Sequence, residues 1–360
     1  MKKSACAVTA LFLTVCLLFS ACSTELLTKL SGGKASPQLT VGVNLTNKTE
    51  NNIFVQTAVP VFGGFDSANI LNARINKLVD QGIDEIKEAG KEMEKNPDRP
   101  PVLLFFQSFF DYSENGDILS VWNTFSNYTG GAHGMSWIRS FTVNRKTGEF
   151  YDTLGSIFQN ETEGKALITD RIIAEIRQKP DLYFPDAEKT VRDKNGNFLY
   201  YIDGSNLVVY FDLYEIAPYV TGIPTFTFPL KDLKTKVETI GTPAGDVRKN
   251  GMSWSFAHPV VSNDSGVFLP LEDMANALNL TVEYKEGKYT VDGKAVQPVM
   301  INSVAYVPLM FFQETLGEFV IYYGDILRMF TQTGGQVTNN SDYGSASSTI
   351  VKSAGSNATA

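Results

Sequence analysis

The chain has 360 residues, of which 43% are hydrophobic, 12% aromatic and 19% charged. This length exceeds what one ordinary hydrophobic core fills, and this composition excludes a wholly disordered protein, so we expect two or three folded units. The formal net charge of −8 argues against nucleic-acid binding and permits a basic partner.

The N-terminal segment has the features of a secretory signal. Lys2 and Lys3 precede an apolar run of signal-peptide length, and small residues stand directly before Cys22. This arrangement resembles a bacterial lipoprotein signal, which implies that residues 1–21 are removed and that Cys22 is lipidated. A plain membrane-spanning anchor is the alternative, for which the run is short. We expect an extracytoplasmic protein that meets the outer face of the cell membrane through its N-terminal lipid only.

Removal of the signal changes the cysteine content and the charge of the mature protein. Cys6 and Cys16 lie in the removed segment and Cys22 carries the lipid, so no cysteine remains for a disulfide, a zinc site or a thiol nucleophile. The loss of Lys2 and Lys3 takes the formal charge from −8 to −10. Stability must therefore come from packing.

Both ends of the mature chain have linker-like composition. Residues 22–38 contain Ser, Gly, Lys and Pro without a sustained period, as expected of a flexible tether. Residues 332–360 are rich in Ser, Thr, Gly and Asn and have few large apolar side chains. Such a segment cannot bury enough surface to offset its ordering entropy, so we predict a disordered tail.

The first predicted elements are strands and a helix. Alternation broken by Asn and Thr in residues 39–62 predicts two short strands. In residues 66–95 apolar side chains recur at every third and fourth position, which predicts a helix. Asp66 or Ser67 is available as its N-cap.

Further along the chain, Asn115-Gly116 provides the positive φ angles of a tight turn and predicts a hairpin of two aromatic strands. A third strand is expected in residues 135–151, a helix over residues 162–178 ended by Pro180, and another hairpin in residues 198–218. One face of that helix carries Leu167, Ile168, Ile172, Ile173 and Ile176. The pattern predicts an α+β fold, an antiparallel sheet packed with two main helices on one side.

The composition changes in residues 239–251, which read as a linker of Gly, Pro and charged residues. Beyond it, GVFLPLEDMANALNL and VAYVPLMFFQETLG each place a proline between a strand pattern and a short helix pattern. Proline suits a helix start because it gives up only an amide that is unpaired there. We expect a small C-terminal α+β domain over residues 246–331.

YTGGAHG, DTLGSIF, PDLYFPD and YEIAPYVTGIPTFTFPLKDL occur in this order between residues 128 and 233. With the strands around them they make residues 40–235 resemble the extracellular domain of RsiV-type anti-sigma factors, which is shared with some polysaccharide deacetylases. The resemblance implies an RsiV-like α+β domain over residues 39–238. The family includes lysozyme receptors, so it also implies lysozyme as a possible partner.

The paired Val/Leu-Pro-Leu passages, with VDGKAVQP between them, make residues 246–330 similar to the copper amine oxidase N-terminal-like stalk domain of Gram-positive surface proteins. That name describes a domain relation and implies neither copper nor amine oxidation.

Neither resemblance carries an activity to this chain. Only three residues precede the apolar run, so we expect no sigma-binding segment. Deacetylases of this kind use a His-x-x-x-His zinc motif, whereas this chain has two histidines, His133 and His258, far apart in the sequence. We expect no catalytic residue, no metal and no cofactor.

The segment YTGGAHGMSW joins two aromatic strands and is the main candidate site. Its glycines suit a bulge or a left-handed turn, and three readings stay open: a structural turn, an exposed recognition loop and a catalytic loop. Catalysis is disfavoured because no partner for the histidine is recognisable. A second candidate is the segment from Tyr214 to Gly222. The predicted ligand-binding residues are Tyr128, Gly130, Gly131, His133, Gly134, Trp137, Tyr214 and Tyr219.

The aromatic strands between residues 105 and 137 alternate, so one set must be core and the other is free to contact carbohydrate or protein. We therefore expect a non-catalytic cell-envelope protein that binds a lysozyme-like protein or wall glycan such as peptidoglycan. The alternatives are an envelope hydrolase whose carboxylates converge from distant strands, and a passive spacer in the wall.

Overall fold

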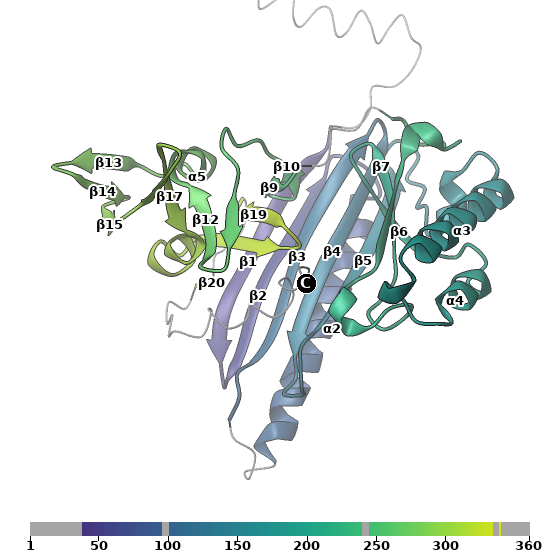
Figure 1. Cartoon of the computed structure of the whole chain (residues 1–360), viewed down its shortest axis with the longest axis horizontal. Helices are drawn as coiled ribbons and strands as arrows, with labels where there is room; N and C mark the ends of the chain where they lie inside the picture. The colour runs from purple at the N-terminus through teal and green to yellow at the C-terminus, as the bar shows by residue number, and fades with distance from the viewer. Residues whose placement is uncertain (1–37, 96–100, 240–244, 334–337, 340–360) are drawn as a thin grey trace, which may run out of the picture. The chain divides into compact units, whose positions relative to one another are not determined.

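The computed structural model describes residues 38–95, 101–239, 245–333 and 338–339 (Figure 1). The predicted signal peptide, Cys22, nearly all of the tether and most of the predicted tail lie outside the described residues. From Leu39 onward the chain groups as one compact unit. The division into domains at residues 39–238 and 246–331 stays a prediction. Among the described helices, none is long and apolar enough to cross a membrane.

A six-stranded sheet forms the centre of the fold, in the order β20-β1-β2-β3-β4-β5. Three neighbouring pairs are antiparallel, whereas β1 with β20 and β2 with β3 run parallel, and a long helix, α2, connects β2 to β3. The α+β class is confirmed, with a mixed sheet. The strands and the helix are β1 (Thr40–Glu50), β2 (Ile53–Gly63), α2 (Ala68–Glu94), β3 (Leu104–Asn115), β4 (Ile118–Tyr128), β5 (Met135–Asn144) and β20 (Thr338–Asn339).

Helix α2 covers one face of this sheet and lies behind it in Figure 1. It buries Leu71, Ile75, Val79 and Ile86. A Cβ on Gly82 would lie 2.1 Å from the Phe106 ring, so only glycine allows this close approach. The predicted N-cap position is confirmed, but the capping hydrogen bond is not. Ser67 is the N-cap residue, but its φ and ψ of −86° and 6° are not extended, and its side chain makes no capping hydrogen bond.

A second, three-stranded sheet of β6 (Leu199–Asp203), β7 (Asn206–Tyr210) and β8 (Thr225–Pro229) packs with the other main helix, α3 (Glu161–Gln178). The two main helices thus cover different sheets. Leu167 is 38% exposed and does not share the buried face predicted for it. The smaller helices of this region are η1 (Leu154–Ile157), η2 (Pro180–Leu182), α4 (Ala187–Asp193), η3 (Tyr219–Thr221) and η4 (Leu230–Asp232).

The edge strand β6 lies across the face of the large sheet that is opposite α2. Three serine hydroxyls from β3, β4 and β5 satisfy its backbone. Ser113 Oγ donates to Ile202 O at 2.9 Å, Ser120 Oγ accepts from Ile202 N at 2.9 Å, and Ser140 Oγ donates to Tyr200 O at 2.5 Å. Buried backbone groups need such partners, so these hydroxyls replace a missing neighbour strand.

The C-terminal region contains three small sheets, in the orders β10-β9-β19-β18, β11-β12-β17-β16 and β13-β14-β15. As expected, Pro270 precedes a helix, α5 (Leu271–Leu278), whereas the second passage forms a π-helix, η5 (Phe311–Thr315). The strands are β9 (Val247–Lys249), β10 (Met252–Ser253), β11 (Val261–Asn263), β12 (Gly266–Pro270), β13 (Val282–Lys285), β14 (Lys288–Val291), β15 (Lys294–Val296), β16 (Val299–Ile301), β17 (Val304–Pro308), β18 (Phe319–Tyr323) and β19 (Ile326–Phe330).

Two predictions of irregular structure are wrong in part. The predicted linker 239–251 contains β9, with Arg248 buried in an ion pair. In the predicted tail, residues 332–360, Thr333 is bridged to Val43 and β20 pairs with β1. In both cases pairing with a distant strand orders a segment whose own composition is unfavourable for structure.

Strand β2 pairs with β3 only along its first five residues, up to Thr57. Further along, the turn between β9 and β10 takes the place of β2, since Tyr112 N donates to Gly251 O at 2.9 Å. Phe330 of β19 packs on Phe110 there, with the ring centroids 5.4 Å apart. The C-terminal strands therefore complete the core of the large sheet.

Two buried ion pairs lie at this junction. Arg328 of β19 bonds both carboxylate oxygens of Asp111 at 2.7 to 3.1 Å, and these side chains are 5% and 1% exposed. Arg248, its register neighbour on β9, bonds Asp203 of β6 at 2.7 Å. Burial raises the pKa of Asp203, although Arg248 opposes the shift. The pairs therefore join β3, β6 and the C-terminal strands through charges that are costly to leave unpaired.

Replacing Asp111 with alanine should lower the free energy of unfolding by about 3–5 kcal/mol, because it leaves Arg328 buried without its counter-charge. The measurement is equilibrium urea unfolding of wild type and variant. Asp152→Ala, which removes the exposed pair with Arg74, is the matched control and should cost less than about 1 kcal/mol. Equal losses for the two variants would contradict this role of the buried pair.

Candidate functional site

The loop between β4 and β5 carries the first group of candidate residues. Tyr128 Oη donates to Gly131 O at 2.9 Å and closes the turn. Gly130 has φ +89°, in the region that favours glycine. A Cβ on Gly134 would lie 2.8 Å from the backbone oxygen of Asn127, whereas one on Gly131 would meet nothing within 4 Å. The loop therefore requires glycine at two of its three glycine positions.

Two tyrosines from the loop after β7 meet this turn at His133. Tyr214 Oη lies 3.1 Å from His133 Nε2, and the ring of Tyr219 lies 4.1 Å from the imidazole, centroid to centroid. We call His133, Tyr214 and Tyr219 the aromatic cluster. The structure thus brings His133 together with two predicted site residues, of which the nearer, Tyr214, is 81 positions away in the sequence.

The hydrogen bonds of the aromatic cluster define the protonation of the neutral imidazole. His133 Nδ1 lies 3.0 Å from the carbonyl oxygen of Gly134, which also accepts a bond from Tyr219 Oη at 3.0 Å. A carbonyl oxygen only accepts, so Nδ1 carries the proton and Nε2 accepts from the Tyr214 hydroxyl. Partial burial raises the pKa of the Tyr219 phenol, with the neighbouring Tyr214 adding to the effect, so this phenol stays protonated.

The loop that carries the two tyrosines is fastened at its start. Arg139 of β5 donates to Asp212 Oδ1 at 2.8 Å, and Glu215 Oε2 accepts from Asp212 N at 2.9 Å. Tyr214 has φ +65°, a conformation that is uncommon for a bulky residue. Such backbone strain persists only where the surrounding contacts fix the conformation. The strained residue here, Tyr214, also has an exposed side chain.

Apolar side chains around the aromatic cluster are exposed. Val220, next to Tyr219, is 79% exposed, and Tyr214 is 46% exposed. Met135, the first residue of β5, is also exposed, but by strand alternation it shares a face with Trp137. Val220 and Met135 were missed by sequence reasoning, because no local pattern distinguishes a single apolar residue at a loop tip from one in the core.

Two predicted residues lie elsewhere. Trp137 stacks on Phe125 with centroids 5.4 Å apart and packs near Phe106, on the α2 side of the sheet. Gly130 faces Met93 and Leu104. The structure does not bring either one into the aromatic cluster.

The chemistry of the aromatic cluster is that of a contact surface. It offers two phenols, an imidazole and a neighbouring exposed valine, and tyrosine is one of the residue types that dominate binding energy at protein interfaces. In the described parts of the chain, no three His, Cys, Asp or Glu side chains are grouped to hold a metal ion. The other histidine, His258, pairs with Asp273 at 2.8 Å.

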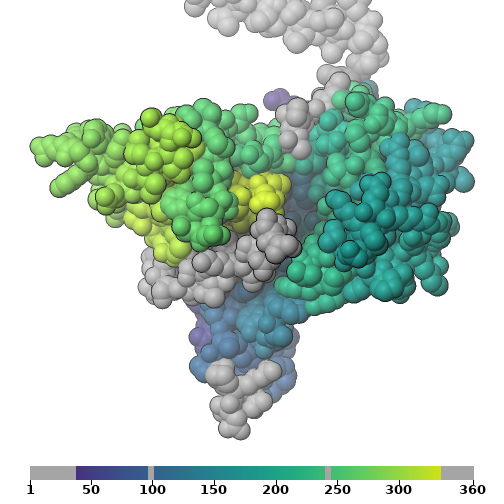
Figure 2. Space-filling model, viewed as in Figure 1, coloured from purple at the N-terminus to yellow at the C-terminus, as the bar shows by residue number. Residues whose placement is uncertain are grey.

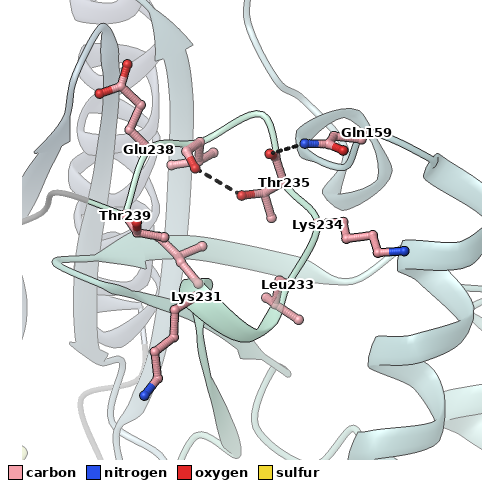
Figure 3. A pocket seen from close by; sticks show the side chains of 9 residues that line it. Gln159, Lys231, Leu233, Lys234, Thr235, Glu238 and Thr239 are labelled. Atoms are coloured by element: carbon pink, nitrogen blue, oxygen red, sulfur yellow. Dashed lines mark hydrogen bonds between the residues drawn. The ribbon is translucent and has the colours of Figure 1, made fainter.

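A shallow pocket of about 610 Å³ lies beside η4 and the segment that follows it (Figure 3). Gln159 Nε2 donates to Thr235 O at 3.2 Å at its rim, and Lys231 and Lys234 are among its lining residues. None of its lining residues belongs to the aromatic cluster. The pocket is open and lined by mixed side chains, and it does not enclose a reactive group.

Known proteins match two separate segments of this chain. Residues 47–136 match the family profile described as deacetylase PdaC, and residues 155–231 match the family described as a protein of unknown function, DUF3298. The anti-sigma-V factor RsiV of Bacillus subtilis is 23% identical over 189 residues, which cover 51% of this chain and 64% of that protein. These similarities support an RsiV-like domain. The copper amine oxidase-like character of residues 246–331 stays a prediction.

Two solved structures resemble part of this chain. A DUF3298 family member from Bacteroides fragilis is 16% identical with a TM-score of 0.41, and covers 57% of this chain and 95% of its own. A DUF3298 family protein from Pseudomonas aeruginosa is 14% identical with a TM-score of 0.36, and the coverage is 56% and 96%. His133 lies in the segment that matches the PdaC profile, residues 47–136. Tyr214 and Tyr219 lie in the segment that matches DUF3298, residues 155–231.

Gly134→Ala should destabilise the protein by about 1–3 kcal/mol, because its Cβ would overlap the Asn127 backbone oxygen. Gly131→Ala is the matched control and should change stability by less than about 0.5 kcal/mol, since the space there is open. Urea unfolding of both variants gives the comparison. A neutral Gly134→Ala would contradict the close approach of the loop to β4.

Proposed function

We propose that this protein is a non-catalytic, lipid-anchored receptor on the outer face of the cell membrane, and that the aromatic cluster binds a lysozyme-like protein. The observation that carries the proposal is the arrangement of His133, Tyr214 and Tyr219, held by mutual hydrogen bonds beside the exposed Val220. Side chains fixed in this way lose little entropy on binding.

Charge and resemblance favour a basic protein as the ligand. The mature chain has a formal charge of −10 after removal of Lys2 and Lys3, which attracts a basic protein such as lysozyme during encounter. Residues 40–235 resemble the extracellular domain of a family that includes lysozyme receptors. This resemblance supports lysozyme as the ligand. The predicted lipid on Cys22 supplies the membrane anchor.

The alternative of an envelope hydrolase has less support. A glycosidase-type site needs two carboxylates that are free to exchange protons with a substrate. The buried carboxylates Asp111 and Asp203 are instead paired with arginines. A passive spacer, the other alternative, has no need for a strained and exposed tyrosine.

Isothermal titration of the mature chain with hen egg-white lysozyme tests this proposal. We expect saturable one-to-one binding that weakens as salt is raised, because screening reduces the electrostatic attraction. Tyr214→Ala and Val220→Asp should each lower the affinity about tenfold or more, because they remove or disrupt central contacts.

Tyr284→Ala is the matched control, since Tyr284 is also an exposed tyrosine but lies on β13. Its affinity for lysozyme should equal that of wild type. The absence of both heat and a complex in size-exclusion chromatography would remove lysozyme as the ligand. Equal losses in Tyr284→Ala and Tyr214→Ala would remove the aromatic cluster as the site.

A further inference from the structure

A row of uncharged polar side chains crosses the large sheet on the face opposite α2. Leu104 and Phe106 lie on the α2 side, near Gly90 and Gly82, so the alternate residues of β3 point to the other face. The strand register then aligns one residue from each of five strands. These residues are Asn47, Gln56, Gln107, Ser126 and Ser136, and all are half-buried.

Hydrogen bonds fix two pairs within this polar row. Gln107 Nε2 donates to Gln56 Oε1 at 2.8 Å, and the hydroxyls of Ser126 and Ser136 lie 2.8 Å apart. Among the described residues, Gln56 Nε2 and Gln107 Oε1 have no further hydrogen-bond partner. The glutamine pair therefore offers one donor and one acceptor at adjacent positions, and their mutual bond holds them in place.

An aromatic row runs beside the polar row. It lies two residues before the polar row on β2 and β3 and two residues after it on the antiparallel β4. Phe54, Phe105 and Tyr128 are register neighbours on β2, β3 and β4. Phe105 and Tyr128 stack with centroids 6.2 Å apart. All three rings are half-buried, and none belongs to a buried hydrophobic cluster, unlike Phe106 and Phe125 on the α2 side. Core packing therefore does not account for them.

The two rows have the chemistry of a carbohydrate site. The flat apolar face of a sugar ring packs on aromatic rings, and its hydroxyl and acetamido groups bond side-chain amides and hydroxyls. Neither row contains a charged residue, in a chain that is 19% charged, so the ligand that fits them is uncharged. Four strand spacings of about 4.8 Å give the polar row a length of about 19 Å, enough for several linked sugars.

We propose that this face is a second binding site, which takes an extended, uncharged glycan chain bearing hydroxyl and acetamido groups. Figure 2 views this side of the molecule, and blue residues reach the molecular surface in its lower part. The site is separate in chemistry from the aromatic cluster. It places the wall polymer on the strands of the large sheet and the protein ligand on the loops.

The test is isothermal titration of the mature chain with chitohexaose as the probe. We expect saturable binding to wild type. Phe54→Ala removes a platform ring, and the double variant Gln56→Ala/Gln107→Ala removes the amide pair. Each should weaken binding about tenfold or more. Tyr284→Ala, an exposed tyrosine outside both rows, should leave the affinity unchanged. Far-UV circular dichroism and thermal unfolding confirm that each variant is folded.

The two sites can be distinguished by titrating each variant with both ligands separately. Phe54→Ala should keep lysozyme binding and Tyr214→Ala should keep chitohexaose binding. If wild type does not bind chitohexaose, or if both Phe54→Ala and the double glutamine variant bind it as wild type does, the glycan site is overturned. That outcome does not bear on the lysozyme proposal. Conversely, if the protein binds chitohexaose but not lysozyme, the lysozyme proposal is overturned and the glycan site is not.

Discussion

The structure depends on a pair of buried arginines that neutralise two buried aspartates. Arg248 and Arg328 are neighbours on β9 and β19, and they reach Asp203 on β6 and Asp111 on β3. Burying a charged side chain costs several kcal/mol of desolvation free energy. Only the attraction to a paired opposite charge offsets this cost. The network therefore fixes which strands lie together, although it need not add much net stability.

This constraint reaches the aromatic cluster through the small sheet. With Asp203 fixed and the backbone of Ile202 bonded to Ser113 and Ser120, β6 has one position on the large sheet. Strand β7 pairs with β6, and the loop after it delivers Tyr214 to His133. The residues that we propose for recognition lie on loops, whereas the charges and hydroxyls that position them lie on strands. This is the usual separation of a binding site from its scaffold.

Local patterns were sufficient for the elements of the large sheet except β20, which lies in the segment predicted as a tail. The Asn115-Gly116 turn and the apolar period of residues 66–95 predict a hairpin and a helix that the structure contains. Segments that depend on distant partners could not be predicted. Arg248 is buried with Asp203 as its partner, and no local pattern indicates this pairing, so composition predicts a linker where the structure has β9. The same holds for the parallel pairing of β2 with β3, which depends on where α2 returns the chain.

The candidate site could be predicted only in pieces. The glycine-rich turn and the segment from Tyr214 to Gly222 were separate candidates, and sequence alone did not indicate that His133 contacts both Tyr214 and Tyr219. Strand alternation could have excluded Trp137, because its register partner Phe125 is fully buried.

Hydrogen–deuterium exchange with and without lysozyme tests the central claim, that the aromatic cluster binds a lysozyme-like protein, most directly. We predict slower exchange at residues 131–136 and 213–223, and unchanged exchange in both segments would contradict the account.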